Sequence, residues 1–305
     1  MSTQVGTTAT PEPVQVPILD KLKGFNTLLE GPAGTGKTHS IGTLIDTGLE
    51  VFYLDCESGL ETLQRYYAEQ DKDIPDNFHW HIVESPKAST KTLMDQAKRV
   101  NTLTYDILTK AIDPDRSKYD QFIKILAALN KFIDDRTGVD YGDVGTWKAN
   151  RVIVIDSLTA LSAASMTNVV GGRPARGMND YQVAQIQLIN FLRLLCTDCR
   201  AHFVLLGHVE RETDLVLGGV KLTVASVGKA QNAIIPTLFS DVVLTVRNGE
   251  KFYWDTASQT ADTKVRYLPI KPEIKPSFQV IVDKWQKYNG IKIADIIAGK
   301  VSEES

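Results

Sequence analysis

The sequence has 305 residues, of which 43% are hydrophobic and 23% are charged, as in ordinary globular proteins. Its formal net charge is only -3, which excludes an overall field that attracts nucleic acid, so any polyanion site must be a local basic cluster. Three cysteines are too few for a protein held together by a disulfide framework. No apolar run approaches the roughly 18 residues that a membrane span needs, which excludes a transmembrane protein. We therefore expect a cytoplasmic protein with no membrane contact.

The chain begins with a segment, residues 1–17, that is rich in threonine, proline and glutamine and lacks the pattern of a signal peptide. We expect this segment to be flexible. Within it, Val14-Gln-Val16 alternates apolar and polar residues between two prolines, which is typical of a short strand that adds to another sheet. Two alternatives remain open, a role in assembly and a disordered tail. We expect one domain over 18–285 and a tail over 286–305.

Six short apolar runs follow in chain order and alternate with helical stretches. The predicted strands are Phe25–Leu29, Val51–Leu54, His79–Val83, Arg151–Ile155, Ala201–Gly207 and Asp241–Val246. Such alternation is typical of βαβ units. The sequence therefore predicts an α/β fold with a mostly parallel central sheet flanked by helices.

The interval between the third and fourth runs, about 86–150, is unusually long. Apolar residues recur there at helical spacing, namely Tyr119, Phe122, Ile123, Leu126, Leu129 and Ile133. We interpret the interval as a helical insertion on the same sheet, without forming a second domain.

A glycine-rich loop follows the first predicted strand and precedes a predicted helix. The run Gly31-Pro32-Ala33-Gly34-Thr35-Gly36-Lys37-Thr38 satisfies the pattern G-x-x-x-x-G-K-[ST]. Its glycines allow backbone N–H groups to surround a phosphate, and the helix adds its positive end. We expect Lys37 to reach the β and γ phosphates of ATP and Thr38 to bind Mg²⁺.

Two carboxylates are candidates for the chemistry beside this loop. Asp156 ends the fourth predicted strand, where it can hold Mg²⁺ through water, the alternative being a solvated aspartate. Glu57 ends the second, and we expect it to orient and deprotonate the attacking water. Asp55 is the alternative for this role.

These motifs together resemble the RecA-type recombinase core. The resemblance rests on the glycine-rich loop, on Asp55-Cys-Glu57 after the second strand, and on Val152-Ile-Val-Ile-Asp156-Ser157. AAA+ ATPases usually place their glutamate directly after that aspartate, where this chain has Ser157. The resemblance is greatest to short, single-domain RecA-like ATPases that phages encode for recombination, and it implies a RecA-like P-loop core.

The same resemblance implies two further catalytic residues. His208 ends Phe203-Val-Leu-Leu-Gly-His208, which is similar to the strand that leads to the γ-phosphate sensor, although RecA carries glutamine there. The segment Thr263–Lys271 is similar to one whose lysines reach the ATP of the neighbouring subunit. By that resemblance Lys271 is the best candidate to act in trans, ahead of Arg266 and Lys264. A solvated basic edge is the alternative.

The resemblance also implies two loops that bind single-stranded DNA. The first, Met166–Asp180, contains Arg173 and Arg176 among glycines, and the second, Glu210–Asn232, contains Lys221 and Lys229. Arginine and lysine neutralise phosphates, and arginine also stacks on bases. Two ordinary surface loops are the alternative.

The sequence therefore predicts a homo-oligomeric ATPase, in a filament or a ring, that is stimulated by single-stranded DNA. Strand exchange or annealing is the main hypothesis for its function. A ring helicase or translocase, a nucleotide-gated DNA-binding scaffold and a small-molecule kinase are the alternatives.

Overall fold

The computed structural model describes residues 22–84, 89–102, 104, 107, 116–171, 173, 176–213 and 218–298. Among these residues, no helix is both long enough and apolar enough to cross a membrane. The N-terminal segment 1–17 lies outside the described residues, and its role in assembly stays a prediction.

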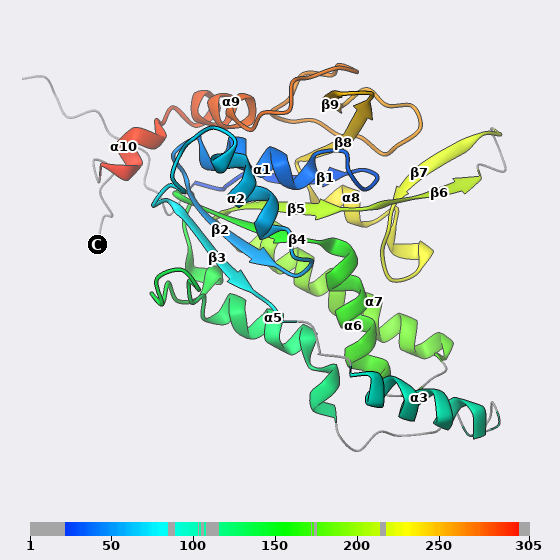
Figure 1. Ribbon diagram of the computed structural model, residues 1–305. Helices are drawn as coiled ribbons and strands as arrows, with labels where there is room; N and C mark the ends of the chain where they lie inside the picture. The colour runs from blue at the N-terminus through cyan, green and yellow to red at the C-terminus, as the bar shows by residue number, and fades with distance from the viewer. Residues whose placement is uncertain are drawn as a thin grey trace, which may run out of the picture.

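A single sheet of seven strands organises the molecule, with the strand order β3-β2-β4-β5-β1-β8-β9 (Figure 1). Its strands are β1 Asn26–Glu30, β2 Glu50–Asp55, β3 Phe78–Ile82, β4 Arg151–Asp156, β5 His202–Gly207, β8 Asp241–Asn248 and β9 Lys251–Asp255. Every pairing in this sheet is parallel except the antiparallel pair β8–β9. The predicted mostly parallel α/β sheet is therefore confirmed, and each of the six predicted strands is present.

The register of the sheet brings four strand ends to one edge. Glu30 of β1 is aligned with Gly207 of β5, and Asp55 of β2 is aligned with Asp156 of β4. Because these strands are parallel, the residues that follow them leave the sheet on the same side. This edge is where ligands bind in sheets of this kind.

Different helices cover the two faces of the sheet. One face carries α1 Lys37–Ile45, α2 Leu60–Ala68, α9 Gln279–Asn289 and α10 Ile293–Ile297, and the other carries α5 Gln121–Asn130, α6 Leu158–Val170, α7 Met178–Arg193 and α8 Ile235–Leu238. The remaining helical segments are α3 Thr90–Thr102 and short turns at Arg116–Tyr119, Val144–Thr146, Leu194–Asp198 and Lys229–Gln231. The result is an α/β/α sandwich with an apolar core on each side of the sheet.

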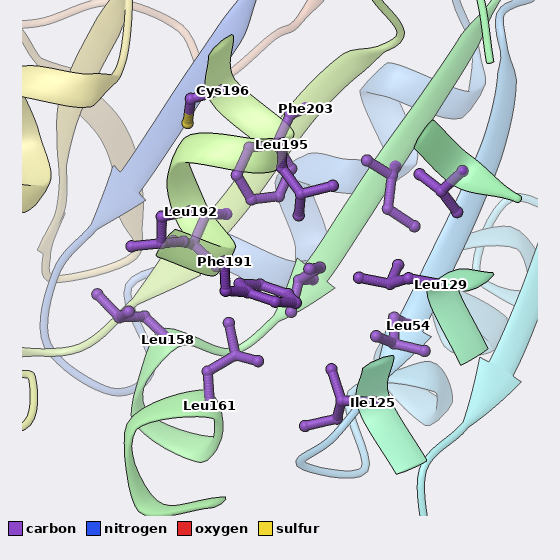
Figure 2. Packing of buried hydrophobic residues seen from close by; sticks show 14 of the residues in the cluster. Leu54, Ile125, Leu129, Leu158, Leu161, Phe191, Leu192, Leu195, Cys196 and Phe203 are labelled. Atoms are coloured by element: carbon purple, nitrogen blue, oxygen red, sulfur yellow. The ribbon is translucent and has the colours of Figure 1, made fainter. Parts of the chain in front are cut away.

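The core beneath α5, α6 and α7 is shown in Figure 2. Ile125 and Leu129 from α5 and Leu158 and Leu161 from α6 pack together with Leu54 of β2. All five side chains are buried. This packing fixes α6, and therefore the segment that follows Asp156, against the sheet.

One face of α5 differs from the predicted stripe. Phe122 and Leu129 are buried as expected, but Ile123 and Leu126 are 56% and 40% exposed. Ile125, which was not in the predicted stripe, is fully buried instead. Helical spacing alone fits either set, and contact with α6 selects the set containing Ile125.

The second predicted DNA-binding loop is in large part a β-hairpin. It consists of β6 Val209–Thr213 and β7 Val220–Val224, which pair antiparallel. Gly218 and Gly219, with φ of 72° and 101°, adopt the backbone region that favours glycine just before β7. The hairpin extends away from the central sheet (Figure 1). The expectation of an irregular loop over Glu210–Asn232 is therefore wrong for its first half.

Candidate nucleotide site and DNA-binding surface

The glycine-rich loop joins β1 to α1 and is held in shape by its own hydrogen bonds. Gly34 and Gly36 have φ of 72° and 83°, so the backbone turns there as side-chain-bearing residues rarely can. The Lys37 amine donates to the carbonyl oxygens of Gly31 and Pro32, at 2.7 Å and 2.9 Å. The loop is thus already wrapped around a space at the N-terminal end of a nine-residue helix, which is an anion-binding arrangement.

Thr38 and Asp156 meet as expected for a magnesium site. The Thr38 hydroxyl donates to Asp156 Oδ2 at 2.9 Å, and the Tyr53 hydroxyl donates to the same oxygen at 2.6 Å. A Cβ on Gly59 would lie 2.5 Å from Asp156 Oδ2, so a side chain there would crowd this oxygen. A hydroxyl and a carboxylate are hard oxygen ligands, and their proximity next to the phosphate loop fits Mg²⁺.

Local hydrogen bonds distinguish Asp55 from Glu57, and the role of either in orienting water stays a prediction. Asp55 is 2% exposed, and its carboxylate accepts from the backbone N–H groups of Glu57, Gly59 and Leu60 at 2.9–3.1 Å. These bonds tie Asp55 to the turn that starts α2. Glu57 instead lines the pocket beside the loop. The geometry therefore favours Glu57 as the residue that orients water.

His208 lies between the two groups that are predicted to act on the γ-phosphate. Its Nδ1 is 3.5 Å from the Lys37 amine, and its Nε2 is 3.5 Å from Glu57 Oε2. His208 directly follows β5, whereas Glu57 follows β2 and Lys37 begins α1. Three elements that are distant in sequence thus bring these side chains together, and the sensor role of His208 stays a prediction.

Burial tunes the charges of this site. Desolvation lowers the pKa of Lys37 to about 8, although Asp156 and Glu57 act in the opposite direction. Burial also raises the pKa of Asp156 above its usual value, while the hydrogen bonds from Tyr53 and Thr38 oppose that rise. Both shifts have burial as their largest cause, because desolvation disfavours the charged form of each group.

The loop, the two carboxylates and His208 enclose one pocket of about 410 Å³, lined by Ala33, Gly34, Thr35, Gly36, Lys37, Thr38, His39, Glu57, Ser58, Gly59, Thr62, Asp156, His208 and Phe252. The sequence analysis did not identify Phe252. It belongs to β9, is 44% exposed, and would lie 3.2 Å from a Cβ on Gly36. The aromatic run Phe252-Tyr253-Trp254 could have indicated a strand, but no strand was predicted there.

A comparison with known families identifies the domain. The family described as AAA domain matches residues 23–267, which is most of the chain. The chain belongs to this AAA domain family. The family's P-loop ATPases bind and hydrolyse nucleotides, which agrees with the pocket described above. No curated protein matches the chain.

The solved structures that resemble this chain have low sequence identity to it and TM-scores below 0.5. The RadB recombinase is 15% identical and covers 82% of this chain and 84% of its own, with a TM-score of 0.38. The flagellar accessory protein FlaH from Methanocaldococcus jannaschii is 11% identical, covers 83% of each chain and has a TM-score of 0.35. An ATPase from the type III secretion system of pathogenic bacteria is 12% identical and covers 81% of this chain but 65% of its own, with a TM-score of 0.38. These similarities concern the fold alone.

In this AAA domain protein, the residue after Asp156 has a structural role. Ser157 is fully buried, and its Oγ accepts a hydrogen bond from the Ala160 N–H at the start of α6. It caps the helix where AAA+ ATPases usually carry their glutamate. The glutamate that lines the pocket is Glu57, as in the RecA-type pattern.

The residues expected to act in a neighbouring subunit lie after β9. Lys271 is exposed, and its backbone is held by Thr256, whose hydroxyl accepts from the Lys271 N–H at 2.9 Å. The Lys264 amine donates to the carbonyls of Thr237 and Phe239, so it is bound within its own chain. Lys264, Arg266 and Lys271 are all exposed, and action in trans stays a prediction.

Three of the four residues predicted to bind DNA form ion pairs within the chain. Arg173 contacts Asp180 at 2.6 Å, Lys221 contacts Asp262 at 3.0 Å, and Lys229 contacts Glu212 at 3.3 Å. Arg176 is exposed and lines a pocket between α6, α7 and the base of the hairpin. Gly172, Pro174 and Ala175 of the first loop lie outside the described residues.

Proposed function

We propose that this protein is an ATP-dependent recombination protein that binds single-stranded DNA, for strand exchange or annealing. In this proposal, subunits assemble into a homo-oligomer and hydrolyse ATP at their interfaces, with Lys271 of one subunit reaching the ATP of the next. The proposal joins the nucleotide pocket to the hairpin and the first loop.

The nucleotide half of the proposal assigns one task to each residue of the pocket. The loop amides and Lys37 bind the phosphates, and Thr38 and Asp156 would hold Mg²⁺, which neutralises charge on the β and γ phosphates. Glu57 orients and deprotonates water for attack on the γ-phosphate. His208 lies 3.5 Å from both Lys37 and Glu57, where it can sense whether the γ-phosphate is present.

A single observation supports the connection to DNA most strongly, namely that His208 is shared by the pocket and the hairpin. Its side chain faces Lys37, its chain neighbour Val209 begins β6, and its carbonyl oxygen accepts the Ala225 N–H at 2.7 Å. Both ends of the hairpin are therefore anchored at one residue. A movement of His208 in response to the γ-phosphate would be transmitted along the hairpin to Lys221, which lies on β7.

The ion pairs of the basic residues are compatible with DNA binding. Pairs at protein surfaces contribute about 0–1 kcal/mol, because solvent screens them. In the pairs Lys221–Asp262 and Lys229–Glu212, a DNA phosphate can replace the carboxylate partner at small cost. Arg173 instead pairs with Asp180, which is 9% exposed. The cations that would contact phosphates are those of the first loop, Arg173 and Arg176, and those of the hairpin side, Lys221 and Lys229.

The proposal is tested by replacing Arg173 and Arg176 together with alanine and measuring single-strand affinity over a range of salt concentrations. Each lost phosphate contact should lower the log–log salt slope by roughly 0.7, while ATP binding is retained. The matched control removes two exposed arginines near the opposite end of the sheet, Arg193 and Arg200, and should leave the slope unchanged. Equal slopes for all three proteins, or no single-strand binding by the unmodified protein, would reject this assignment.

A further inference from the structure

A second pocket, of about 330 Å³, lies between α6, the start of α7 and the segment that follows the hairpin. It is lined by Thr159, Ser162, Ala163, Met166, Thr167, Arg176, Tyr181, Glu210, Ala225, Ser226, Val227 and Gly228. The α6 residues recur at intervals of three and four, so one side of this helix forms a wall. The volume lies at the lower end of the range for small-molecule sites, roughly 300–1,000 Å³. Nothing in the proposed nucleotide chemistry uses this pocket.

The wall formed by α6 contains two hydroxyls without a partner. Thr159 Oγ1 and Ser162 Oγ are both buried and make no hydrogen bond among the residues that the structure describes. Ser162 is only 5% exposed. Buried hydroxyls without a partner are costly, so their presence in a pocket wall indicates a polar ligand that completes them.

The other side of the pocket carries a carboxylate that is fixed in place. Glu210 lies on β6, and its Oε1 accepts from Asn232 Nδ2 at 3.4 Å. Asn232 is itself anchored, because its Oδ1 accepts from the Ser226 hydroxyl at 2.7 Å. A carboxylate accepts hydrogen bonds and repels phosphate. This side of the pocket therefore suits an N–H-bearing group, and the phosphate must lie elsewhere.

Arg176 and Tyr181 supply the remaining chemistry. Arg176 is exposed and belongs to the loop before α7, and Tyr181 is half-buried on α7. A guanidinium binds phosphate, and an aromatic ring offers a stacking surface to a base. Hydroxyls, a carboxylate, a cation and an aromatic ring around one small pocket are the set that recognises a nucleotide.

We propose that this pocket receives one unstacked base of the bound single strand and prefers bases with an exocyclic amino group. Glu210 accepts the amino N–H of the base, and Arg176 binds the adjoining phosphate. The hydroxyls of Ser162 and Thr159 form hydrogen bonds with the other polar atoms of the base. Cytosine offers an N4 amino donor to a carboxylate, whereas thymine offers only an O4 acceptor at the same position. This inference rests on the proposed single-strand binding and adds base selectivity to it.

The test compares the affinities of labelled oligodeoxycytidine and oligothymidine of equal length, measured by fluorescence anisotropy with a non-hydrolysable ATP analogue. The unmodified protein should bind the cytidine oligomer about fivefold more tightly, as expected for one good base contact. Glu210→Gln should bring this ratio close to one, because an amide can donate to thymine O4 as well as accept from cytosine. Ser162→Ala should weaken binding of both oligomers. That variant removes a hydroxyl without a partner, so its folding is not at risk.

Glu212→Gln is the matched control, since Glu212 lies on the same strand, carries the same charge and does not line the pocket. It should change the affinity for both oligomers alike and preserve their ratio, because its partner is Lys229. A ratio of one in the unmodified protein, or a ratio that Glu210→Gln leaves unchanged, would overturn the base pocket alone. Failure to bind either oligomer would overturn the proposed function, and this inference with it.

Discussion

Glu30 is the side chain whose replacement should change the pH dependence of stability most. It ends β1 directly before the glycine-rich loop and is 1% exposed, and neither carboxylate oxygen has a hydrogen-bond partner among the described residues. Burial raises its pKa from 4.5 to about 8, with a further rise from Asp262 and a partial offset from Lys221. At neutral pH this group is therefore protonated in the folded protein and ionised in the unfolded chain.

The sign and size of the effect follow from proton binding. Between about pH 5 and pH 8 the folded state binds one proton more than the unfolded state at this position, so the free energy of unfolding falls as the pH rises. The slope approaches 1.4 kcal/mol per pH unit, and the loss over this window is about 3 kcal/mol. Glu30→Gln keeps the shape of the side chain and cannot ionise. The variant should therefore lose about 3 kcal/mol less than the unmodified protein between these two pH values.

Urea unfolding at several pH values measures this difference, with the buried Trp254 and Trp285 as fluorescent reporters. Glu69→Gln removes an exposed carboxylate just after α2 and serves as the control, for which the pH profile should match that of the unmodified protein. If the Glu30→Gln and unmodified profiles ran parallel between pH 5 and pH 8, Glu30 would not be protonated in the folded state. The reasoning from burial would then be refuted.

Four further outcomes are expected. Lys37→Ala should abolish ATP binding, because it removes the positive side chain that contacts the phosphates. An unchanged ATP affinity in a calorimetric titration would contradict this prediction. Glu57→Gln should bind ATP normally but lose turnover, so hydrolysis at the unmodified rate would rule out Glu57 as the base. ATP affinity should fall as the pH rises above about 8, where Lys37 loses its proton, with a decline approaching tenfold per pH unit. An affinity that stayed constant between pH 8 and pH 9 would contradict it. Deletion of residues 1–17 should leave a folded monomer that binds ATP but does not assemble on DNA, as light scattering would show. The deletion should also lower the DNA-stimulated ATPase rate, because that turnover needs Lys271 of a neighbouring subunit. Full assembly with normal turnover would contradict this prediction.

The inner strands of the sheet were predictable because they are buried on both faces and read largely as apolar runs. The strands missed by the sequence analysis do not have this property. β9 reads Lys251-Phe-Tyr-Trp-Asp255 and lies at the end of the strand order, and β6 reads Val209-Glu-Arg-Glu-Thr213 with mostly polar side chains. Such strands are specified by a turn and by a partner strand, which composition does not reveal.

The nucleotide site was predictable where a local motif defines it. Residues 31–38 follow from the spacing of glycine, lysine and threonine, and Asp156 follows from its position at the end of an apolar run. The choice between Asp55 and Glu57 needed the hydrogen bonds that engage Asp55 in the turn before α2. Phe252 required the position of a strand distant in sequence, so no local signal could assign it to the pocket.

The proposed DNA-binding surface was least predictable, because the sequence does not reveal the ion pairs that Arg173, Lys221 and Lys229 form. Asp262, which contacts Lys221, lies 41 positions further along the chain, and no local pattern joins the two. The pairing has a consequence for the nucleotide site, because Asp262 raises the pKa of Glu30 and Lys221 lowers it. If Lys221 moved from Asp262 to a DNA phosphate, the carboxylate left behind would raise the pKa of Glu30 further. Single-strand binding by the hairpin and protonation directly before the glycine-rich loop would then favour each other, because linkage between two equilibria is reciprocal.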